Sequence, residues 1–496
     1  MAQFISTEPS RTLMEFRLLP GYTTSESISE HISLRTPLVY TSHSSTKYEI
    51  NIPVVSAAMQ SVSGAKMAIE LAKAGGISFL FCSQSIESQT AMMRAVKHHK
   101  AGFVTPHTVN KNTSIERLHQ LRTEHGFNTF PVVDDEEKFL GIITRNDYDI
   151  NSHRDMSVSD RMIPKQSLVT GTGITNLKSA NSLLMESHQS VLPILDSNGK
   201  LSSLVFRKDI YDHLDNPAQV VDEKKRLLCG AAINTHDYKE RVPALVNEGA
   251  DILCIDSSDG YSEFQKETIK WITSNFPDTP VVAGNVVTAE GFRFLVENGA
   301  AAVKVGMGSG SICITQEQKG TGRGLATAIM KTAQERDKYF AETGKYIPIC
   351  ADGGIGNSKD ISVALALGAD YIMMGRYFAR MEESPTEKII INDRIMKPYW
   401  GEGSNRAREW HENRYSQSKF AEGVEGFVEY AGRLKDSLDV TISKIKSTLS
   451  TCGVSDIAQL HANAQLEVVS ALSIREGKVH DIFMPDKSSY PDSEGY

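Results

Sequence analysis

The sequence predicts an α/β protein whose core is a (β/α)8 TIM barrel with a second domain inserted into it. Short apolar runs of strand length recur along most of the 496 residues and alternate with segments long enough for a helix, which is typical of βα units around a parallel sheet. Three of the intervening segments end in the same Gly-Ala dipeptide, and one interval between runs is long enough for a domain of its own. In such a barrel the functional residues lie on the loops after the carboxyl ends of the strands.

Eight runs are expected to form the barrel strands, because each is short, apolar and separated from the next by a helix-length segment. In chain order they span residues 52–59, 76–81, 226–233, 251–258, 280–286, 301–308, 347–354 and 370–376. The helices before three of them are expected to end at Gly249, Gly299 and Gly368. Glycine adopts the left-handed conformation that ends a helix, so the chain can turn back into the sheet there.

The interval between the second and third runs is far longer than an ordinary βα loop of roughly 2–6 residues. We expect a domain to be inserted there, in a single βα loop. It contains an internal repeat, because 131–147 aligns without gaps with 193–209. The pattern resembles the tandem cystathionine-β-synthase (CBS) module, a nucleotide-sensing pair. We therefore expect barrel residues at 1–101, a tandem CBS (Bateman) module at 102–217, and barrel residues again at 218–496. A structural insertion without a ligand is the alternative.

The composition is that of an ordinary globular protein and excludes several classes. Apolar residues make up 40% and charged residues 23% of the chain, and the net charge of −8 gives no footprint for nucleic acid. No run approaches the roughly 18 apolar residues of a membrane span, and the amino end lacks the apolar core of a secretion signal. The six cysteines have no paired spacing and the 14 histidines no ligand spacing. We therefore expect no disulfide framework, no catalytic metal and a cytoplasmic location.

The most informative motif is VGMGSGSICITQE, which follows the sixth run. Its glycines, Gly306, Gly308 and Gly310, free the backbone to present N–H groups to an anion. It is not a dinucleotide fingerprint, because Ser311 stands where the third glycine is needed. Cys313 follows the glycines directly, and a thiol in such a loop at a barrel mouth can be ionised and reached. Cysteines inside strand runs are more often inert core residues.

Two strand ends carry lone carboxylates, Asp256 and Asp352, which are well placed to hold sugar hydroxyls. Helix capping is the alternative for both. Gly354 after the seventh run and Gly375-Arg376 after the eighth run lie where many barrels form a phosphate clamp.

A barrel lysine can form a Schiff base with a carbonyl substrate, and Lys304 in the sixth run raises that alternative, but its neighbour Val305 and the downstream Cys313 argue against it. Beyond the last strand, residues 397–430 are long, polar and glycine-containing, which is typical of a mobile flap. A disordered surface loop is the alternative there.

Taken together, GSGSICITQE, ADGGI, MMGR, YWGEGS and NRY resemble the family of inosine 5′-monophosphate (IMP) dehydrogenases and guanosine monophosphate (GMP) reductases. The resemblance covers nearly the whole chain. The length, the inserted pair and the Arg414-Tyr415 dyad of the flap favour the dehydrogenase branch, because the reductase is expected to be much shorter and to lack both.

The resemblance implies NAD-dependent oxidation of IMP to xanthosine 5′-monophosphate through a covalent bond to Cys313. Cys313 is expected to attack C2 of the hypoxanthine, and hydride then leaves C2 for the nicotinamide. A thioimidate remains that water must cleave. Arg414 with Tyr415 would activate that water, and Thr315 would assist.

The resemblance also implies the binding residues. The 5′-phosphate would be held by Ser311, Gly354, Gly375 and Arg376, and the ribose by Asp352. The surroundings of the base would be Tyr399, Glu402, Gly403 and Glu422. The cofactor side would be Asp256 and Gly306. A monovalent cation, potassium, would bind oxygens of Gly308, Gly310 and Cys313, completed by Glu476 and Gly477 of a neighbouring subunit in a homotetramer.

Some positions depart from the family pattern. Arg376 stands where many relatives have Ser, and Glu402 and Glu422 stand where many have Met and Gln. In the inserted repeat, Thr144 offers a hydroxyl for a nucleotide ribose, whereas Phe206 offers none, so purine nucleotides are expected to bind the two halves unequally. Two rival functions stay open: a GMP reductase that uses NADPH, and a catalytically silent nucleotide sensor built around the CBS pair.

Overall fold

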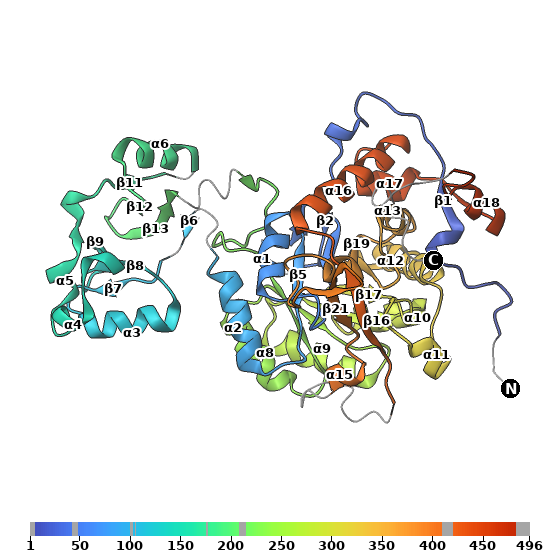
Figure 1. Ribbon diagram of the computed structural model, residues 1–496, viewed down its shortest axis with the longest axis horizontal. Coiled ribbons are helices and arrows are strands. Elements are labelled where there is room, and N and C mark those ends of the chain that lie inside the picture. The colour runs from blue at the N-terminus through green and yellow to red at the C-terminus, as the bar shows by residue number, and fades with distance from the viewer. Residues whose placement is uncertain are drawn as a thin grey trace. The chain divides into compact units, whose positions relative to one another are not determined.

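The computed structural model describes residues 5–41, 48–99, 103–104, 106–174, 177–207, 215–408 and 420–482. The chain divides into two compact units (Figure 1). The larger unit consists of Met1–Lys97, Ala218–Val220 and Leu228–Tyr496, and the smaller unit of His98–Pro217 and Val221–Leu227.

The larger unit is a closed barrel of eight parallel strands, which confirms the predicted fold class. Around the barrel the strands follow the order β14-β15-β16-β17-β18-β19-β4-β5. Each strand lies within one of the eight apolar runs, and almost all of their side chains are buried. The strands are β4 (Val54–Ser56), β5 (Ile77–Leu80), β14 (Gly230–Ile233), β15 (Ile252–Ile255), β16 (Val281–Val286), β17 (Ala302–Val305), β18 (Ile349–Asp352) and β19 (Tyr371–Met374).

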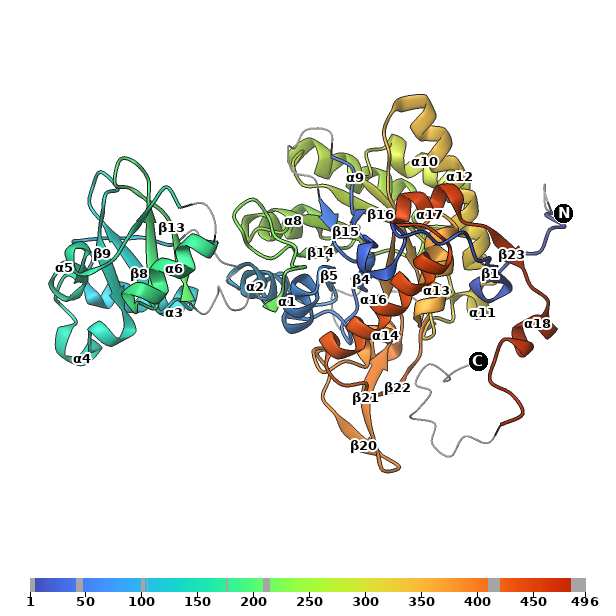
Figure 2. The same cartoon turned by 90° about the horizontal axis from the view of Figure 1, so that it is seen from above.

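Helices cover the outside of this ring of strands (Figure 2). Several begin at a side-chain cap: Ser262, Thr288 and Asn357 each accept a hydrogen bond from a backbone N–H of the first turn. Their apolar stripes face the strands. The covering helices are α1 (Ala65–Lys73), α2 (Ile86–Lys97), α8 (Tyr238–Asn247), α9 (Glu263–Asn275), α10 (Ala289–Glu297), α12 (Leu325–Thr343), α13 (Ser358–Ala366) and α16 (Leu434–Thr451).

The smaller unit follows α2, not β5. We expected the insertion in a βα loop, and this detail was wrong: a complete βα unit, β5 and α2, precedes it, so the insertion occupies the αβ connection that leads to β14. The αβ connections lie at the amino ends of the strands, away from the loops that carry the chemistry.

The internal repeat corresponds to two similar hairpins of the smaller unit. One hairpin is β8 (Thr129–Val133) with β9 (Phe139–Thr144), and the other is β12 (Val191–Leu195) with β13 (Leu201–Phe206). Each belongs to a four-stranded sheet, in the orders β10-β9-β8-β7 and β11-β12-β13-β6. The other strands are β6 (Phe103–Val104), β7 (Val109–Asn110), β10 (Ile163–Pro164) and β11 (Gly171–Thr172), and the described α-helices are α3 (Ile115–His125), α4 (Ile150–His153), α5 (Val158–Arg161) and α6 (Leu177–Ser187).

The larger unit contains further elements besides the barrel strands and their covering helices. A three-stranded sheet is formed by β20 (Ile389–Ile391), β21 (Arg394–Trp400) and β22 (Glu425–Glu429). The strand β1 (Phe16–Leu18) pairs with β23 (Leu466–Val468), and α18 (Ala471–Glu476) follows. In the part of the chain that is described, no helix combines the length and apolarity that crossing a bilayer requires.

The three predicted glycine turns are confirmed. Gly249, Gly299 and Gly368 have φ angles of 90°, 106° and 112°, which side chains rarely adopt. A Cβ atom on Gly368 would also lie 2.5 Å from the Cβ atom of Ala333 on α12. Glycine is therefore needed at Gly368 both for its backbone conformation and for close packing.

The residue two positions after the glycine has a role that the sequence did not reveal. The Asp251 carboxylate accepts the N–H of Cys229 (2.8 Å), at the start of the preceding strand, and pairs with Lys97 (2.6 Å). Asp370 does the same four strands further around the barrel, before β19: it accepts a hydrogen bond from the N–H of Ile349 (2.7 Å) and pairs with Arg336 (3.1 Å). Each aspartate thus ties a buried cation of a helix to the first N–H of a neighbouring strand.

We predict that Asp370→Asn lowers the free energy of unfolding by about 3 kcal/mol, because it leaves the Arg336 guanidinium, 4% exposed, without its buried counter-charge. The matched control is Asp337→Asn. Asp337 contacts the same guanidinium at 2.9 Å but is 65% exposed, so its loss should cost less than about 1 kcal/mol. Urea denaturation of both variants checks this, and equal losses would contradict it.

Candidate active site

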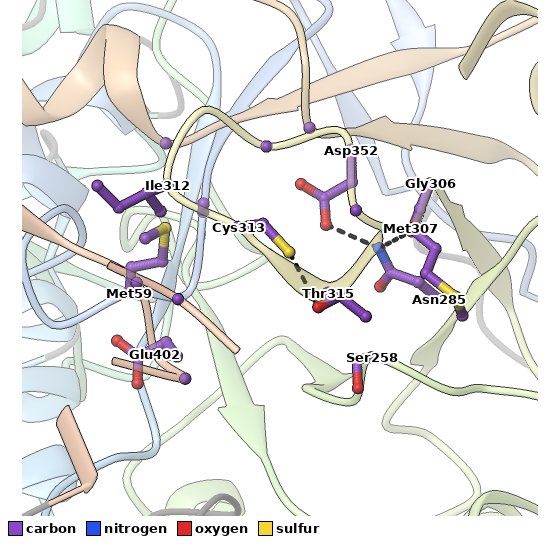
Figure 3. Close-up of a pocket in the computed structure, with 18 of the residues that line it drawn as sticks. Met59, Ser258, Asn285, Gly306, Met307, Ile312, Cys313, Thr315, Asp352 and Glu402 are labelled. Carbon is purple, nitrogen blue, oxygen red and sulfur yellow. Dashed lines mark hydrogen bonds between the residues drawn. The ribbon is translucent and has the colours of Figure 1, made fainter. Parts of the chain in front are cut away.

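One pocket lies at the carboxyl ends of the barrel strands, where the sequence predicts the chemistry (Figure 3). Its walls come from the loops after β4, β15, β17, β18 and β19, from Asn285 within β16, and from the later segments 399–403 and 422–423. The structure brings together most of the residues proposed from the sequence. The lining contains Asp256, Gly306, Gly308, Gly310, Cys313, Thr315, Asp352, Gly375, Tyr399, Glu402, Gly403 and Glu422.

The Cys313 thiol is partly exposed in this pocket. Its Sγ atom lies 3.1 Å from Oγ1 of Thr315, and the two side chains point toward one another (Figure 3). The loop is held in a tight turn, because the N–H of Cys313 donates to the carbonyl oxygen of Gly310 at 3.0 Å. A thiol next to a hydroxyl can pass its proton to that oxygen.

The other cysteines do not offer a reactive thiol in the pocket. Burial raises the pKa of Cys229 and of Cys350, which lie in or beside barrel strands. Cys82 and Cys254 are also buried. Cys452 is half-buried beyond the end of α16, and burial raises its pKa as well. Cys313 is therefore the one cysteine that the described part of the chain presents in the pocket.

The Cys313 loop is hydrogen-bonded to residues 422–424, which lie inside the segment 397–430 that the sequence predicts as a mobile flap; the described ends of that segment are instead paired in a sheet as β21 and β22. The N–H of Ile314 donates to the carbonyl oxygen of Glu422 at 3.0 Å, and the N–H of Val424 donates to that of Ile312 at 3.0 Å. This pairing brings the side chain of Glu422 above α11 (Thr315–Lys319). There it accepts a hydrogen bond from the Thr315 hydroxyl at 3.3 Å and pairs with Lys319 at 2.7 Å.

A second cluster of polar side chains lies around Asp352, at the end of β18. Oδ2 of Asp352 accepts from Nζ of Lys304 at 2.9 Å and from Nδ2 of Asn285 at 3.0 Å. Burial is the largest single influence and by itself would lower the pKa of Lys304, but the charge of and hydrogen bond to Asp352, together with the charges of Cys254 and Asp256, outweigh burial and raise the pKa. Lys304 is thus a paired ammonium, which argues against its serving as a Schiff-base nucleophile.

The glycines and the arginine that the sequence predicts as a phosphate clamp lie after β18 and β19. Gly354 has a φ angle of 70°, and a Cβ atom there would lie 3.0 Å from the carbonyl oxygen of Ser309. The Arg376 guanidinium lies close to Gly356, and Gly375 lies close to the hydroxyl of Tyr399. These glycines leave room beside a cation.

Ser311, Gly354 and Arg376 adjoin the pocket lining without forming part of it. Tyr399 is buried beside Ser311, and burial raises the pKa of Tyr399 to about 12.

Glu402 has a different environment from the one expected. Its carboxylate accepts hydrogen bonds from the N–H of Gln60 (2.6 Å) and from the hydroxyl of Ser83. The Gln60 side chain in turn accepts from the indole N–H of Trp400 (2.8 Å). Glu402 therefore joins β21 to the loops after β4 and β5, in addition to lining the pocket.

Two groups of predicted residues are not found in the pocket. Arg414 and Tyr415 lie outside the described residues. Glu476 and Gly477 lie at the end of α18 and are absent from the pocket lining.

Sequence reasoning missed several residues of the site. Met59 and Gln60 follow the first strand, and Asn285 is a polar residue in an otherwise apolar run, so their positions could have indicated them. Lys319 lies four residues after Thr315, the spacing that places two residues on one helix face. Within the described ranges, no three His, Cys, Asp or Glu side chains are grouped as metal ligands.

Comparison with known proteins gives one consistent family. Residues 10–480 match the family described as the IMP dehydrogenase / GMP reductase domain. An inosine-5′-monophosphate dehydrogenase from Tritrichomonas foetus is 48% identical over 499 residues, which cover 98% of this chain and 99% of the relative. The corresponding enzyme of Escherichia coli strain K12 is 38% identical over 451 residues, covering 88% and 91%.

A solved structure extends the comparison to the other branch. A cysteine-to-alanine variant of GMP reductase from Trypanosoma brucei, in complex with guanosine 5′-monophosphate, is similar with a TM-score of 0.80 and 27% identity. The match covers 96% of this chain and 99% of that chain. The expectation that a reductase is much shorter was therefore wrong, and neither length nor the inserted unit separates the two branches.

We predict that Glu402→Ala lowers the free energy of unfolding by about 2 kcal/mol, because two donors, the Gln60 N–H and the Ser83 hydroxyl, lose their buried acceptor. Glu402→Gln, which keeps one acceptor oxygen, should fall between this variant and the unmodified protein. Exposed Glu425 on β22 provides the control, Glu425→Gln. Thermal and urea denaturation measure all three, and an unchanged Glu402→Ala would show that the contacts contribute nothing.

Proposed function

The chain belongs to the IMP dehydrogenase / GMP reductase family, and we propose that it oxidises IMP to xanthosine 5′-monophosphate with NAD. The observation that carries this proposal is the Cys313 thiol, partly exposed in the pocket and 3.1 Å from the Thr315 hydroxyl. A thiolate is a soft nucleophile suited to an electron-poor ring carbon. The 48% identity to a dehydrogenase over almost the full length favours this branch.

The residues of the pocket suit the substrate. The Asp352 carboxylate, oriented by Lys304 and Asn285, would accept hydrogen bonds from the ribose hydroxyls. The phosphate would lie near Ser311, Gly354, Gly375 and Arg376, where the glycines provide space and the guanidinium provides charge. Tyr399, Glu402, Gly403 and Glu422 would surround the base.

The other side of the pocket fits a cofactor. Asp256, Ser257, Ser258 and Gly306 line it there. The Oδ1 atom of Asn285 is buried and has no hydrogen-bond partner among the described residues, so a ligand N–H or O–H would satisfy it. When bound, NAD supplies the acceptor for the hydride that leaves C2 of the substrate.

We propose a route for the first half of the reaction that uses the contacts of Thr315. Its hydroxyl donates to Glu422 and so presents an oxygen lone pair to the thiol. As the thiol proton moves to Thr315, the hydroxyl proton moves to Glu422. The Sγ atom then bonds to C2, and the electron pair of the ring C=N bond moves onto nitrogen. That pair restores the double bond as hydride leaves, which yields a thioimidate on Cys313.

The second half is hydrolysis. We propose that Arg414 and Tyr415 activate a water molecule whose oxygen bonds to C2. The C–S bond then breaks and the sulfur regains a proton. Thr315 and Glu422 can carry that proton back along the same contacts. The overall balance is IMP, NAD+ and water giving xanthosine 5′-monophosphate, NADH and a proton.

Three further assignments are proposals of the same kind. Carbonyl oxygens suit a hard ion such as potassium, so Gly308, Gly310 and Cys313 would hold it, with Glu476 and Gly477 from a neighbouring subunit. That requires an oligomer, for which we propose a homotetramer. The smaller unit would act as a CBS pair for purine nucleotides. In its first repeat the Thr144 hydroxyl donates to the Asp147 carboxylate at 2.7 Å. Asp209, which corresponds to Asp147 in the second repeat, lies outside the described residues.

The rival activity is GMP reduction, which the structural similarity to a GMP reductase supports. Incubating the purified protein with IMP and NAD, and separately with GMP and NADPH, distinguishes the two by the sign of the absorbance change at the reduced-nicotinamide band. We expect NADH to accumulate from IMP. Consumption of NADPH with GMP alone would reverse the assignment, and no change in either mixture would favour a nucleotide sensor.

We predict that two variants separate the two halves of the reaction. Cys313→Ala should lose hydride transfer and hydrolysis together, because no adduct forms. Arg414→Ala should give a rapid burst of NADH of about one per active site and then stall, because only water activation is lost. Stopped-flow absorbance measures the burst, and mass spectrometry should find the nucleotide on the Cys313 peptide. A folded Arg414→Ala protein that binds IMP without a burst would show that the dyad acts earlier.

A further inference from the structure

A buried carboxylate next to the proposed nucleophile depends on one lysine. Glu422 is 5% exposed, and its two oxygens have different partners: Oε2 accepts from the Thr315 hydroxyl at 3.3 Å, and Oε1 pairs with Nζ of Lys319 at 2.7 Å. Thr315 and Lys319 are four residues apart on the single turn of α11. Both therefore reach Glu422 from the same helix face.

The two partners of this ion pair differ in exposure: the Glu422 carboxylate is buried, whereas the Lys319 side chain is partly exposed. Removing a carboxylate from water is unfavourable unless a cation or several donors compensate it. The Lys319 side chain is 38% exposed, so its ammonium keeps much of its hydration while it compensates the buried partner. The backbone of Glu422 is held separately, by hydrogen bonds with Ile314 and Gly403, so the lysine acts on the side chain alone.

We propose that Lys319 is a positioning residue for the reaction: it holds Oε1 of Glu422 so that Oε2 stays on the Thr315 hydroxyl, which in turn faces Sγ of Cys313. The inference rests on the proposed function, in which Thr315 and Glu422 carry the thiol proton. Lys319 itself is outside the pocket lining and would touch neither substrate nor cofactor. Its effect should therefore appear in kcat and not in KM.

A simpler role has to be distinguished. Lys319 is the last residue of α11, followed by Gly320 with a left-handed φ of 66°, and a cation near a helix carboxyl end stabilises the helix by itself. If helix stabilisation were the only role of Lys319, replacing Lys319 would change kcat and the urea midpoint by the same amount whether or not Glu422 carries a charge. A double-mutant cycle with Glu422→Gln separates the two roles.

The variants are Lys319→Met, which keeps the apolar stem, and Lys319→Arg, which keeps the charge. Glu422→Gln supplies the second background. The control is Lys331→Met, which removes the same charge from an exposed position on α12. For each we would measure kcat and the KM for IMP at saturating NAD, and the urea midpoint of unfolding.

We expect Lys319→Met to lower kcat by about tenfold, which is less than the full contribution of a positioned proton carrier. The KM for IMP should stay within about twofold of that of the unmodified protein. Lys319→Arg should restore most of kcat. In the Glu422→Gln background Lys319→Met should change kcat by less than about twofold and should shift the urea midpoint less than it does in the unmodified protein.

Unchanged kcat in Lys319→Met, a Lys319→Arg as slow as Lys319→Met, or an equal loss in the Glu422→Gln background would each overturn the inference. Lys331→Met is expected to match the unmodified protein, and a tenfold loss there would assign the effect to net charge and so contradict the proposal. An unmodified protein that does not oxidise IMP would contradict the proposed function instead. The unfolding cycle then still tests the Lys319–Glu422 pair, and additive midpoint shifts would overturn it.

Discussion

The geometry of the site depends on a short antiparallel pairing between two segments that are far apart in sequence. The Cys313 loop and residues 422–424 exchange backbone hydrogen bonds on either side of a bridge between Cys313 and Gly423. The same segment pairs on its other side with Gly401 and Gly403. Each such bond contributes only about 1 kcal/mol, yet together they set the positions of the thiol, the Thr315 hydroxyl and the Glu422 carboxylate. A displacement of this segment would move all three groups at once.

The pocket also requires both parts of the chain that the inserted unit separates. Met59 and Gln60 come from before the insertion, whereas Cys313, Asp352 and Glu402 come from after it. The barrel joins the two parts in two places, because β5 pairs with β14 and β4 pairs with β19. The Glu402 contacts with Gln60 and Ser83 add a third connection at the level of the pocket. An insertion at the amino ends of the strands leaves this arrangement of loops intact.

The fold could be predicted because its determinants are local. A strand buried on both faces is a continuous apolar run, and the glycines that end helices before strands are visible as Gly249, Gly299 and Gly368. What the sequence could not show were side-chain pairings that exist only once helices and strands are packed together. Asp370 looks like any residue at a strand start until Arg336 and Ile349 are brought to it. Likewise Glu402 was assigned to the base by resemblance, but only the fold shows that Gln60 and Ser83 hold its carboxylate, and Lys319 gave no signal beyond its spacing from Thr315. The position of the insertion was misjudged because nothing in the apolar pattern marked α2 as part of the barrel.

The order of strands around the barrel has a consequence for how the chain folds as it is synthesised. β4 is the first barrel strand to be made, but one of its two neighbours is β19, the last. Until residues 371–374 leave the ribosome, one edge of β4 has unpaired N–H and C=O groups beside apolar side chains, a surface that promotes aggregation. The strands of the smaller unit pair only with one another, between residues 103 and 206. That unit can therefore complete its sheets while the barrel is still open, and the long interval before barrel closure is the stage at which a nascent chain of this topology most needs protection by a chaperone.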